Sequence, residues 1–142
     1  MKKEKMIIFE GISGSGKTTL FHPTHKLSNY RDVMLHRFTP THWVQDKVNR
    51  RRVHDYEELN AGLQSIAEVF VIWCDVAPDI AMKRQIAKKD PMIEDLRIAR
   101  TLFYEYFTEV TSFKNILHVN TGTKDLETCV EEIKEFVYGK DW

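Results

Sequence analysis

The chain has 142 residues, of which 42% are hydrophobic and 30% charged, as expected for one ordinary globular domain. Basic and acidic residues number 21 each, so the formal net charge is zero, which argues against a dedicated nucleic-acid or membrane-surface binder. No apolar run approaches the length of a membrane span, and the two cysteines, Cys74 and Cys129, follow no metal or redox spacing. We therefore expect a single cytoplasmic domain over residues 1–142, with two reduced, buried thiols and no nucleic-acid or membrane partner.

The N-terminal segment carries the strongest motif. Residues 6–9 form a short apolar run typical of a buried strand, and residues 11–18 read Gly-Ile-Ser-Gly-Ser-Gly-Lys-Thr. This octapeptide matches G-x-x-x-x-G-K-[ST], the phosphate-binding P-loop, in the strand–loop–helix context that the motif requires. Its glycines let successive backbone N–H groups point at an anion, and the helix that follows adds its positive dipole end. Lys17 would bring a positive charge to the β- and γ-phosphates, and the Thr18 hydroxyl could coordinate Mg²⁺.

Strand and helix patterns alternate along the rest of the chain. The helix that starts at Lys17 should kink or end early at Pro23, because proline removes a helical hydrogen bond and clashes with the preceding turn. Apolar runs predict further strands at residues 33–36, 69–74 and 116–119, and the middle one is apolar on both faces, as in a central parallel strand. Helical spacing predicts helices at residues 40–48, 55–67, 78–89, 91–110 (capped by Asp90) and 126–137.

This alternation predicts an α/β fold of three layers, with a parallel sheet of about four strands flanked by helices. Together with the loop motif it indicates a P-loop NTPase fold. Ligand sites in such sheets lie beyond the carboxyl ends of the strands. The residues at those ends are Glu10, His36, Arg37, Asp75 and Asn120. We therefore expect the functional site to contain the loop and side chains from this set.

Several polar residues allow two interpretations. His22 and His25 have a spacing that could suit a metal, but no third ligand is near, and we expect two solvent-facing histidines. Arg50–Arg52 could contact a phosphate or form a solvated basic turn. Glu10 and Asp75 could each act on a metal through a water molecule, or each could cap a neighbouring element.

The segment Phe9–Thr19 closely resembles the opening of thymidylate kinases, and more widely of nucleoside and nucleoside-monophosphate kinases. Cys74–Ala81 is similar to the fourth-strand motif of that family, an Asp-Val followed by a proline, an acidic residue and an apolar pair. The segment from Arg84 to Lys89, with the Asp-Pro break after it, resembles the lid in which arginines fold over the transferring phosphate. His36–Phe38 stands where the family has Asp-Arg-aromatic. The resemblance covers most of the chain, and its most specific part is the P-loop.

The resemblance implies an ATP-dependent phosphotransferase that acts on a nucleotide, most simply a deoxynucleoside monophosphate such as dTMP, with a homodimer as a possible assembly. It implies catalytic roles for Lys17 at the donor phosphates, for Arg37 at the acceptor phosphate and for Arg84, with Lys88, in the lid. Thr18 would also ligate Mg²⁺. The residues implied to bind the ATP phosphates are Gly11, Ser13, Gly14, Ser15, Gly16, Lys17, Thr18 and Thr19.

The chain departs from the family in three respects. The second strand and its flanking helices, which hold much of the acceptor in the family, have no room between Pro23 and Asp32. His36 replaces an aspartate that helps to hold Mg²⁺, and Ser13 stands where thymidylate kinases often have an acidic residue near the acceptor sugar. These departures leave two alternatives open: a non-catalytic nucleotide-binding module, and a P-loop kinase of another small acceptor.

Overall fold

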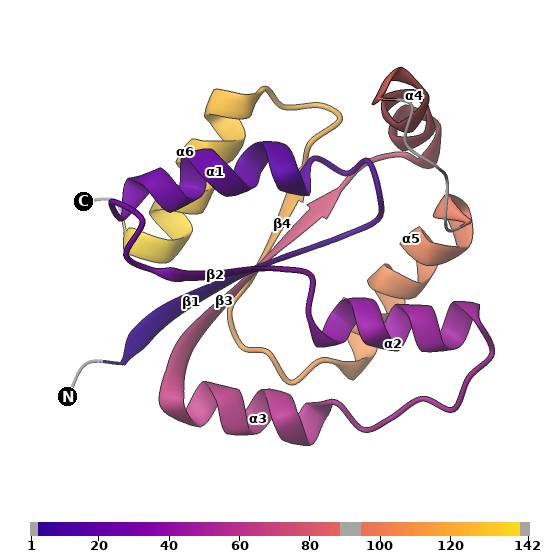
Figure 1. The fold of residues 1–142 in the computed structure, drawn as a ribbon, viewed down its shortest axis with the longest axis horizontal. Coiled ribbons are helices and arrows are strands. Elements are labelled where there is room, and N and C mark those ends of the chain that lie inside the picture. Colours follow the sequence, from indigo (N-terminus) through magenta and orange to yellow (C-terminus); the bar gives the residue numbers. More distant parts are fainter. Residues whose placement is uncertain (1–2, 89–94, 140–142) are drawn as a thin grey trace.

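The computed structural model describes residues 3–88 and 95–139. Four strands form one parallel sheet in the order β2-β1-β3-β4 (Figure 1). Their bounds are β1 Glu4–Glu10, β2 Val33–His36, β3 Ala67–Asp75 and β4 Ile116–Asn120. The sheet and its flanking helices confirm the predicted α/β fold.

Helices cover both faces of the sheet. Figure 1 shows α1 and α6 on one face and α2, α3 and α5 on the other, while α4 lies beyond the carboxyl end of β3. The helices are α1 Lys17–Leu27, α2 Thr39–Val48, α3 Glu57–Ile66, α4 Pro78–Lys88, α5 Leu96–Glu105 and α6 Leu126–Tyr138, with a π-helical turn, η1 Tyr106–Val110, after α5. The layers leave the carboxyl ends of the strands, the P-loop and α4 at one edge of the molecule.

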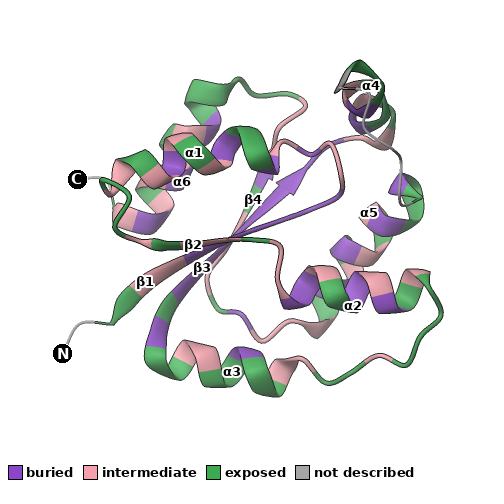
Figure 2. Ribbon diagram, in the orientation of Figure 1, coloured by how far each residue is buried: buried purple, intermediate pink, exposed green. Residues whose placement is uncertain are grey.

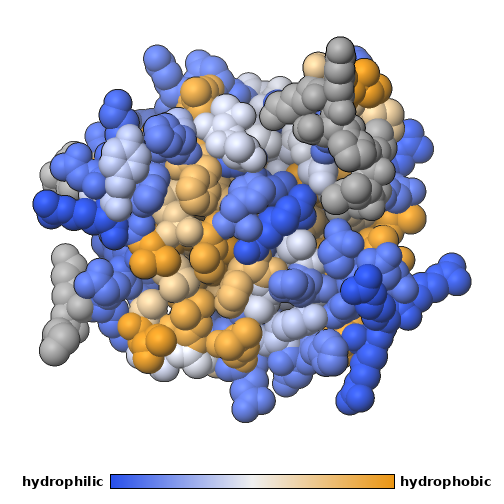
Figure 3. Space-filling view, in the orientation of Figure 1, coloured by the Kyte–Doolittle hydropathy of each residue, from blue (hydrophilic) through white to orange (hydrophobic). Residues whose placement is uncertain are grey.

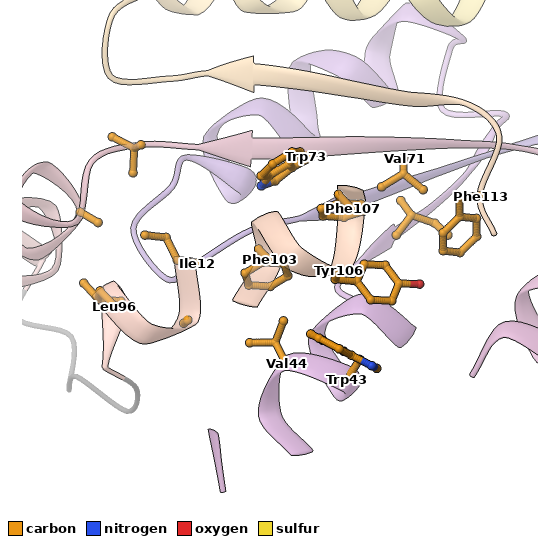
Figure 4. Close-up of a cluster of buried hydrophobic side chains, with 14 of the residues drawn as sticks. Ile12, Trp43, Val44, Val71, Trp73, Leu96, Phe103, Tyr106, Phe107 and Phe113 are labelled. Carbon is orange, nitrogen blue, oxygen red and sulfur yellow. The ribbon is translucent and has the colours of Figure 1, made fainter. Parts of the chain in front are cut away.

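The central strand β3 divides two hydrophobic cores. Phe70 and Ile72 face the core under α1 and α6, while Val71 and Trp73 face the larger core under α2 and α5. Eight of its nine residues are buried, and Figure 2 shows purple along most of the strand. The larger core gathers side chains of α2, α5 and η1, and Phe107 of η1 stacks on Trp73 (Figure 4). Burial of both faces explains why this segment is apolar without alternation.

The helix α1 runs through Pro23 to Leu27, so of the two predicted outcomes, a kink or an early end, the early end is wrong. A proline in the helix removes one backbone hydrogen bond, but Leu20 and Thr24 on the same helix are buried between the sheet and α6. The Thr24 hydroxyl also donates to the Leu20 carbonyl oxygen at 2.7 Å. Tertiary packing therefore stabilises the helix beyond the proline.

Two other predicted helices differ from the structure at their ends. The helix predicted over residues 55–67 spans Glu57–Ile66, and β3 begins directly at Ala67. The predicted cap, Asp90, lies outside the described residues. In the described part the helix begins at Leu96, where the Asp95 side chain accepts hydrogen bonds from two backbone amides of the first turn. It changes to π-helical geometry at Tyr106, well before its predicted end at residue 110.

The sheet ends at β2, which pairs with β1 alone among the described strands. Only residues 28–32 connect α1 to β2, in agreement with the expectation that the family's extra strand has no room here. Val33 is 50% exposed, and Leu59 and Ile66 on α3 are 56% and 73% exposed. Figure 3 shows hydrophobic side chains gathered in the area between β2 and α3. Within residues 3–88 and 95–139, no helix combines the length and apolar character needed to cross a membrane.

Candidate functional site

The P-loop joins β1 to α1 in a conformation that depends on glycine. Gly14 and Gly16 have φ values of +80° and +94°, in the left-handed region that L-residues with a side chain rarely adopt. A Cβ atom at Gly14 would lie only 2.7 Å from the Ala81 carbonyl oxygen on α4. Gly16 is the N-cap of α1 and supplies no side-chain cap to its first turn. The start of the helix, with its positive dipole end, therefore faces the loop.

The ammonium group of Lys17 lies across this loop. Its Nζ donates to the carbonyl oxygens of Gly11 at 2.9 Å and Ile12 at 2.6 Å, and to Ser15 Oγ at 3.2 Å. The side chain is almost entirely buried, at 4% exposure. A full positive charge is thus held within the loop, at the position where the motif predicts it.

A cavity of about 180 Å³ opens beside the loop and is rich in cationic groups. Lys17 from α1, Arg37 from the end of β2 and Arg84 from α4 all line it. None of the described residues that line it carries a carboxylate. The lining residues are Ser13, Gly14, Gly16, Lys17, Thr18, Thr19, His36, Arg37, Arg84 and Gln85. Three cations around so small a space suit a polyanion such as a phosphate chain.

A second cavity, of about 400 Å³, lies on the α6 side of the same loop. It shares Gly14, Gly16, Thr19 and Arg84 with the first cavity, so the two are neighbours. Its lining combines aliphatic groups with a few polar ones, which is typical of pockets for planar organic groups. The remaining lining residues are Leu20, Thr121, Lys124, Leu126 and Cys129.

The Arg84 guanidinium stands at the boundary of the two cavities. Its Nη1 donates to the Gly14 carbonyl oxygen at 2.9 Å and to Thr121 Oγ1 at 3.1 Å, and its Nη2 donates to the Thr121 carbonyl oxygen at 2.8 Å. Thr121 Oγ1 in turn donates to the carbonyl oxygen of Ser15. Arg84 therefore fastens the P-loop to the loop after β4. The side chain of Lys88, the second residue predicted for the lid, lies outside the described part of the structure.

The end of β2 brings Arg37 and His36 to the loop. The Arg37 Nη2 donates to Ser13 Oγ at 3.2 Å, which places the guanidinium beside the P-loop. His36 Nε2 lies 3.4 Å from Thr18 Oγ1. Desolvation, together with the positive charges of Lys17 and Arg37, lowers the pKa of His36 below its ordinary value. A neutral imidazole therefore stands next to the threonine at pH 7.

The two carboxylates at the strand ends connect elements of the fold. Glu10 is fully buried, and its two oxygens accept hydrogen bonds from the Phe38 backbone N–H and the Thr41 hydroxyl. Asp75 accepts hydrogen bonds from two side chains of α5 and from His118 Nε2, the last at 2.9 Å. These contacts favour the interpretation of both residues as caps rather than as metal-directed carboxylates.

The other polar residues with two interpretations lie away from both cavities. His25 Nε2 is 3.1 Å from the Asp32 carbonyl oxygen, and its ring packs against Phe21 and Tyr30. The described residues contain no group of three histidine, cysteine, aspartate or glutamate side chains that could hold a metal ion. Arg50–Arg52 are exposed between α2 and α3 and line neither cavity. Their position favours a solvated basic turn.

Of the residues predicted to bind phosphates, most line the cationic cavity. Two do not: Gly11 packs against the Cys74 backbone, where a Cβ atom would lie 2.1 Å from the carbonyl oxygen, and Ser15 is buried beneath the loop. No motif in the sequence pointed to Gln85 or Lys124 as lining residues. Thr121 was not predicted by name, although the strand end before it, Asn120, was expected at the site.

Comparison with known proteins agrees with this geometry at the level of the fold. No protein-family model matches the chain, and no curated protein matches it by sequence. Solved structures do match. They show that the chain shares its α/β fold with kinases of the P-loop type.

Three structures illustrate the similarity. The YorR protein from Bacillus subtilis, solved in complex with phosphorylated GDP, is 18% identical, with a TM-score of 0.71 over 90% of this chain and 92% of that chain. A putative kinase from Chloroflexus aurantiacus is 16% identical, with a TM-score of 0.56 over 95% and 96%. Deoxyadenosine kinase from M. mycoides, solved with its products dCMP and dCDP, is 14% identical, with a TM-score of 0.55 over 92% and 96%.

Proposed function

We propose that this protein is an ATP-dependent phosphotransferase whose acceptor is a nucleotide, most simply a deoxynucleoside monophosphate such as dTMP. The observation that carries the proposal is the cationic cavity, in which Lys17, Arg37 and Arg84 converge on the P-loop beside a larger pocket of mixed polarity. The nucleotide ligands of two proteins with the same fold, phosphorylated GDP and dCMP with dCDP, support a nucleotide as substrate. The single domain, residues 1–142, would hold the whole site.

The residues divide between the two substrates by position. The N–H groups at the start of α1 and the Lys17 ammonium would bind the donor phosphates, and the pocket bounded by Arg84 and Thr121 has the size and lining for the donor base. Arg37 contacts the loop at Ser13, does not line the pocket assigned to the donor base, and would hold the acceptor phosphate. Phosphoryl transfer depends mainly on such positioning and charge neutralisation.

The donor set of the cavity fits a magnesium ion only in part. The Thr18 hydroxyl is a hard oxygen ligand of the kind that Mg²⁺ accepts, but no carboxylate is present among the described lining residues. Thr18 is therefore the residue that would hold the ion. When bound with the nucleotide, the ion would neutralise phosphate charge.

The decisive test of the proposal compares two ligands in one variant. Arg37→Ala should weaken the binding of the acceptor, measured with a panel of nucleoside monophosphates, about ten- to a hundredfold, because a charge-assisted contact contributes roughly 1.5–3 kcal/mol. Binding of ATP should be almost unchanged, since Arg37 lies on the Ser13 side of the loop. Isothermal titration calorimetry gives both constants, and a coupled assay of ADP release gives turnover.

The control for charge alone is Arg52→Ala, which removes an exposed arginine that lines neither cavity and should change neither constant. An equal loss of ATP and acceptor binding in Arg37→Ala would place this arginine in the donor site instead. Absence of ADP release with every nucleoside monophosphate would count against a nucleotide acceptor.

A second candidate function, a non-catalytic nucleotide-binding module, is favoured by one observation. His36, without a negative charge, stands beside Thr18 where a carboxylate would help to fix the metal. A protein that binds ATP tightly, yet releases no ADP with any acceptor or with water, would support this alternative.

His36 also gives a prediction about metal dependence. His36→Asp should lower the Mg²⁺ concentration needed for half-maximal ATP binding about ten- to a hundredfold, the usual effect of an outer-shell partner of a metal. His36→Asn is the matched control, because it removes the imidazole without adding charge and should leave the Mg²⁺ requirement high. If the two variants behave alike in a calorimetric Mg²⁺ titration, the position does not act on the metal.

A further inference from the structure

The conformation of Arg37 is unusual for a residue with a side chain. Its φ of +72° lies in the left-handed region, which brings Cβ close to the backbone carbonyl and is disfavoured for arginine. Such a conformation persists only when neighbouring contacts enforce it. At this site it sends the chain from the end of β2 into α2 while the guanidinium stays beside Ser13.

The contacts that enforce the conformation come from consecutive residues at the end of β1. The Arg37 backbone N–H donates to the Phe9 carbonyl oxygen at 2.9 Å. The next N–H, that of Phe38, donates to a Glu10 side-chain oxygen, and the second oxygen of Glu10 accepts from the Thr41 hydroxyl in the first turn of α2. The peptide groups on both sides of the arginine are thus fixed to β1.

Both carboxyl oxygens of Glu10 accept a hydrogen bond at this corner, from a fully buried position. Burial raises the pKa of Glu10 to about 7 even though hydrogen bonds from Thr41 and Phe38 and the charges of Arg37 and Lys17 lower it. An apolar side chain would avoid this cost, but it could not accept the Phe38 N–H. The corner therefore requires an acceptor in this place.

We infer that Glu10 is a positioning residue, which acts through the Phe38 amide to hold Arg37 in its left-handed conformation with the guanidinium at the P-loop. The inference rests on the proposed function in assigning Arg37 to the acceptor phosphate. Glu10 itself lines neither cavity and would contact neither substrate. Its effect should consequently appear in the acceptor constant and not in the donor constant.

The first experiment measures KM for ATP and for dTMP, the acceptor used as probe, in Glu10→Leu and Glu10→Gln. Leucine fills the space but accepts no hydrogen bond, and we expect the dTMP KM to rise about tenfold with the ATP KM within about twofold. Glutamine keeps a carbonyl oxygen that accepts from the Phe38 N–H and an N–H₂ that can donate to the Thr41 oxygen, so both KM values should stay at their wild-type level. The matched control is Asp75→Asn, a strand-end carboxylate in a separate network, which should not separate the two constants.

The second experiment does not depend on turnover. NMR chemical shifts and ³J couplings of Arg37 report its φ directly, and they should show the loss of the left-handed conformation in Glu10→Leu and its retention in Glu10→Gln. If no acceptor is phosphorylated, the proposed function fails but this measurement still decides the role of Glu10. A left-handed Arg37 in Glu10→Leu would overturn the inference, as would equal changes in both KM values.

If Glu10→Leu does not fold, Thr41→Val provides the test. It removes only the second hydrogen bond and should raise the dTMP KM by a smaller factor, about threefold, at an unchanged ATP KM. An unchanged dTMP KM in that variant, with Arg37 in its native conformation, would overturn the inference.

Discussion

Replacement of Lys17 by alanine is expected to abolish tight ATP binding, with a loss in affinity of about a hundredfold or more. The ammonium is held inside the P-loop by two carbonyl oxygens and the Ser15 hydroxyl, so its charge is already positioned before a nucleotide arrives. Hydrogen bonds to charged groups contribute roughly 1.5–3 kcal/mol each, and the lysine can make more than one to a phosphate chain. Calorimetric titration of ATP in the presence of Mg²⁺ gives the affinity.

The same variant should remain folded. Lys17 contacts the loop and not the two hydrophobic cores, although the loss of its hydrogen bonds to the Gly11 and Ile12 carbonyl oxygens should reduce stability slightly. Lys26→Ala is the matched control, since this lysine is exposed in the last turn of the same helix and should leave ATP affinity unchanged. Wild-type affinity in a folded Lys17→Ala protein, judged by circular dichroism, would refute the assignment of the P-loop as the phosphate site.

The free energy of unfolding should fall as pH rises through neutrality, and Glu10 should be the cause. The pKa of this buried carboxyl is raised from 4.5 to about 7 in the folded protein, so the folded state holds a proton that the unfolded state has released. Stability from this group is fully present below pH 4.5 and is lost as pH approaches and passes 7. The shift corresponds to an upper value of about 3 kcal/mol.

Urea unfolding at several pH values between 5 and 8 measures this effect. Glu10→Gln should remove most of the slope, because glutamine keeps the shape, accepts from the Phe38 N–H and can donate to the Thr41 oxygen, but cannot titrate. Asp75→Asn is the control, because the pKa of Asp75 is shifted in the opposite direction to that of Glu10. Burial would raise the pKa of Asp75, but hydrogen bonds from Arg100, Tyr104 and His118 outweigh burial and hold it below its ordinary value. The stabilising contribution of Asp75 is lost only as pH falls into the acid range, so Asp75→Asn should leave the slope between pH 5 and 8 unchanged. Equal slopes in the wild type and in Glu10→Gln would show that Glu10 does not cause the fall in stability.

Local sequence patterns were sufficient to predict the strands, the P-loop and most of the fold. Continuous apolar runs identified β1 and β3, because a parallel strand buried on both faces has no polar side to show. The glycines and Lys17 identified the loop, because a chain can wrap an anion only with residues that adopt left-handed conformations and supply charge. These requirements lie within a few adjacent residues and are therefore visible in the sequence.

The tertiary structure decided how distant residues reach that loop. Arg84 was expected as a lid cation, and its guanidinium donates hydrogen bonds to Gly14 and Thr121, residues far from it in the chain. The left-handed Arg37 depends on Glu10, which lies on another strand. Likewise α1 continues past Pro23 because the sheet and α6 bury its face. At Arg37 and Pro23 long-range contacts outweigh a local backbone preference of about 1–3 kcal/mol, and in all three cases no local pattern records the contacts.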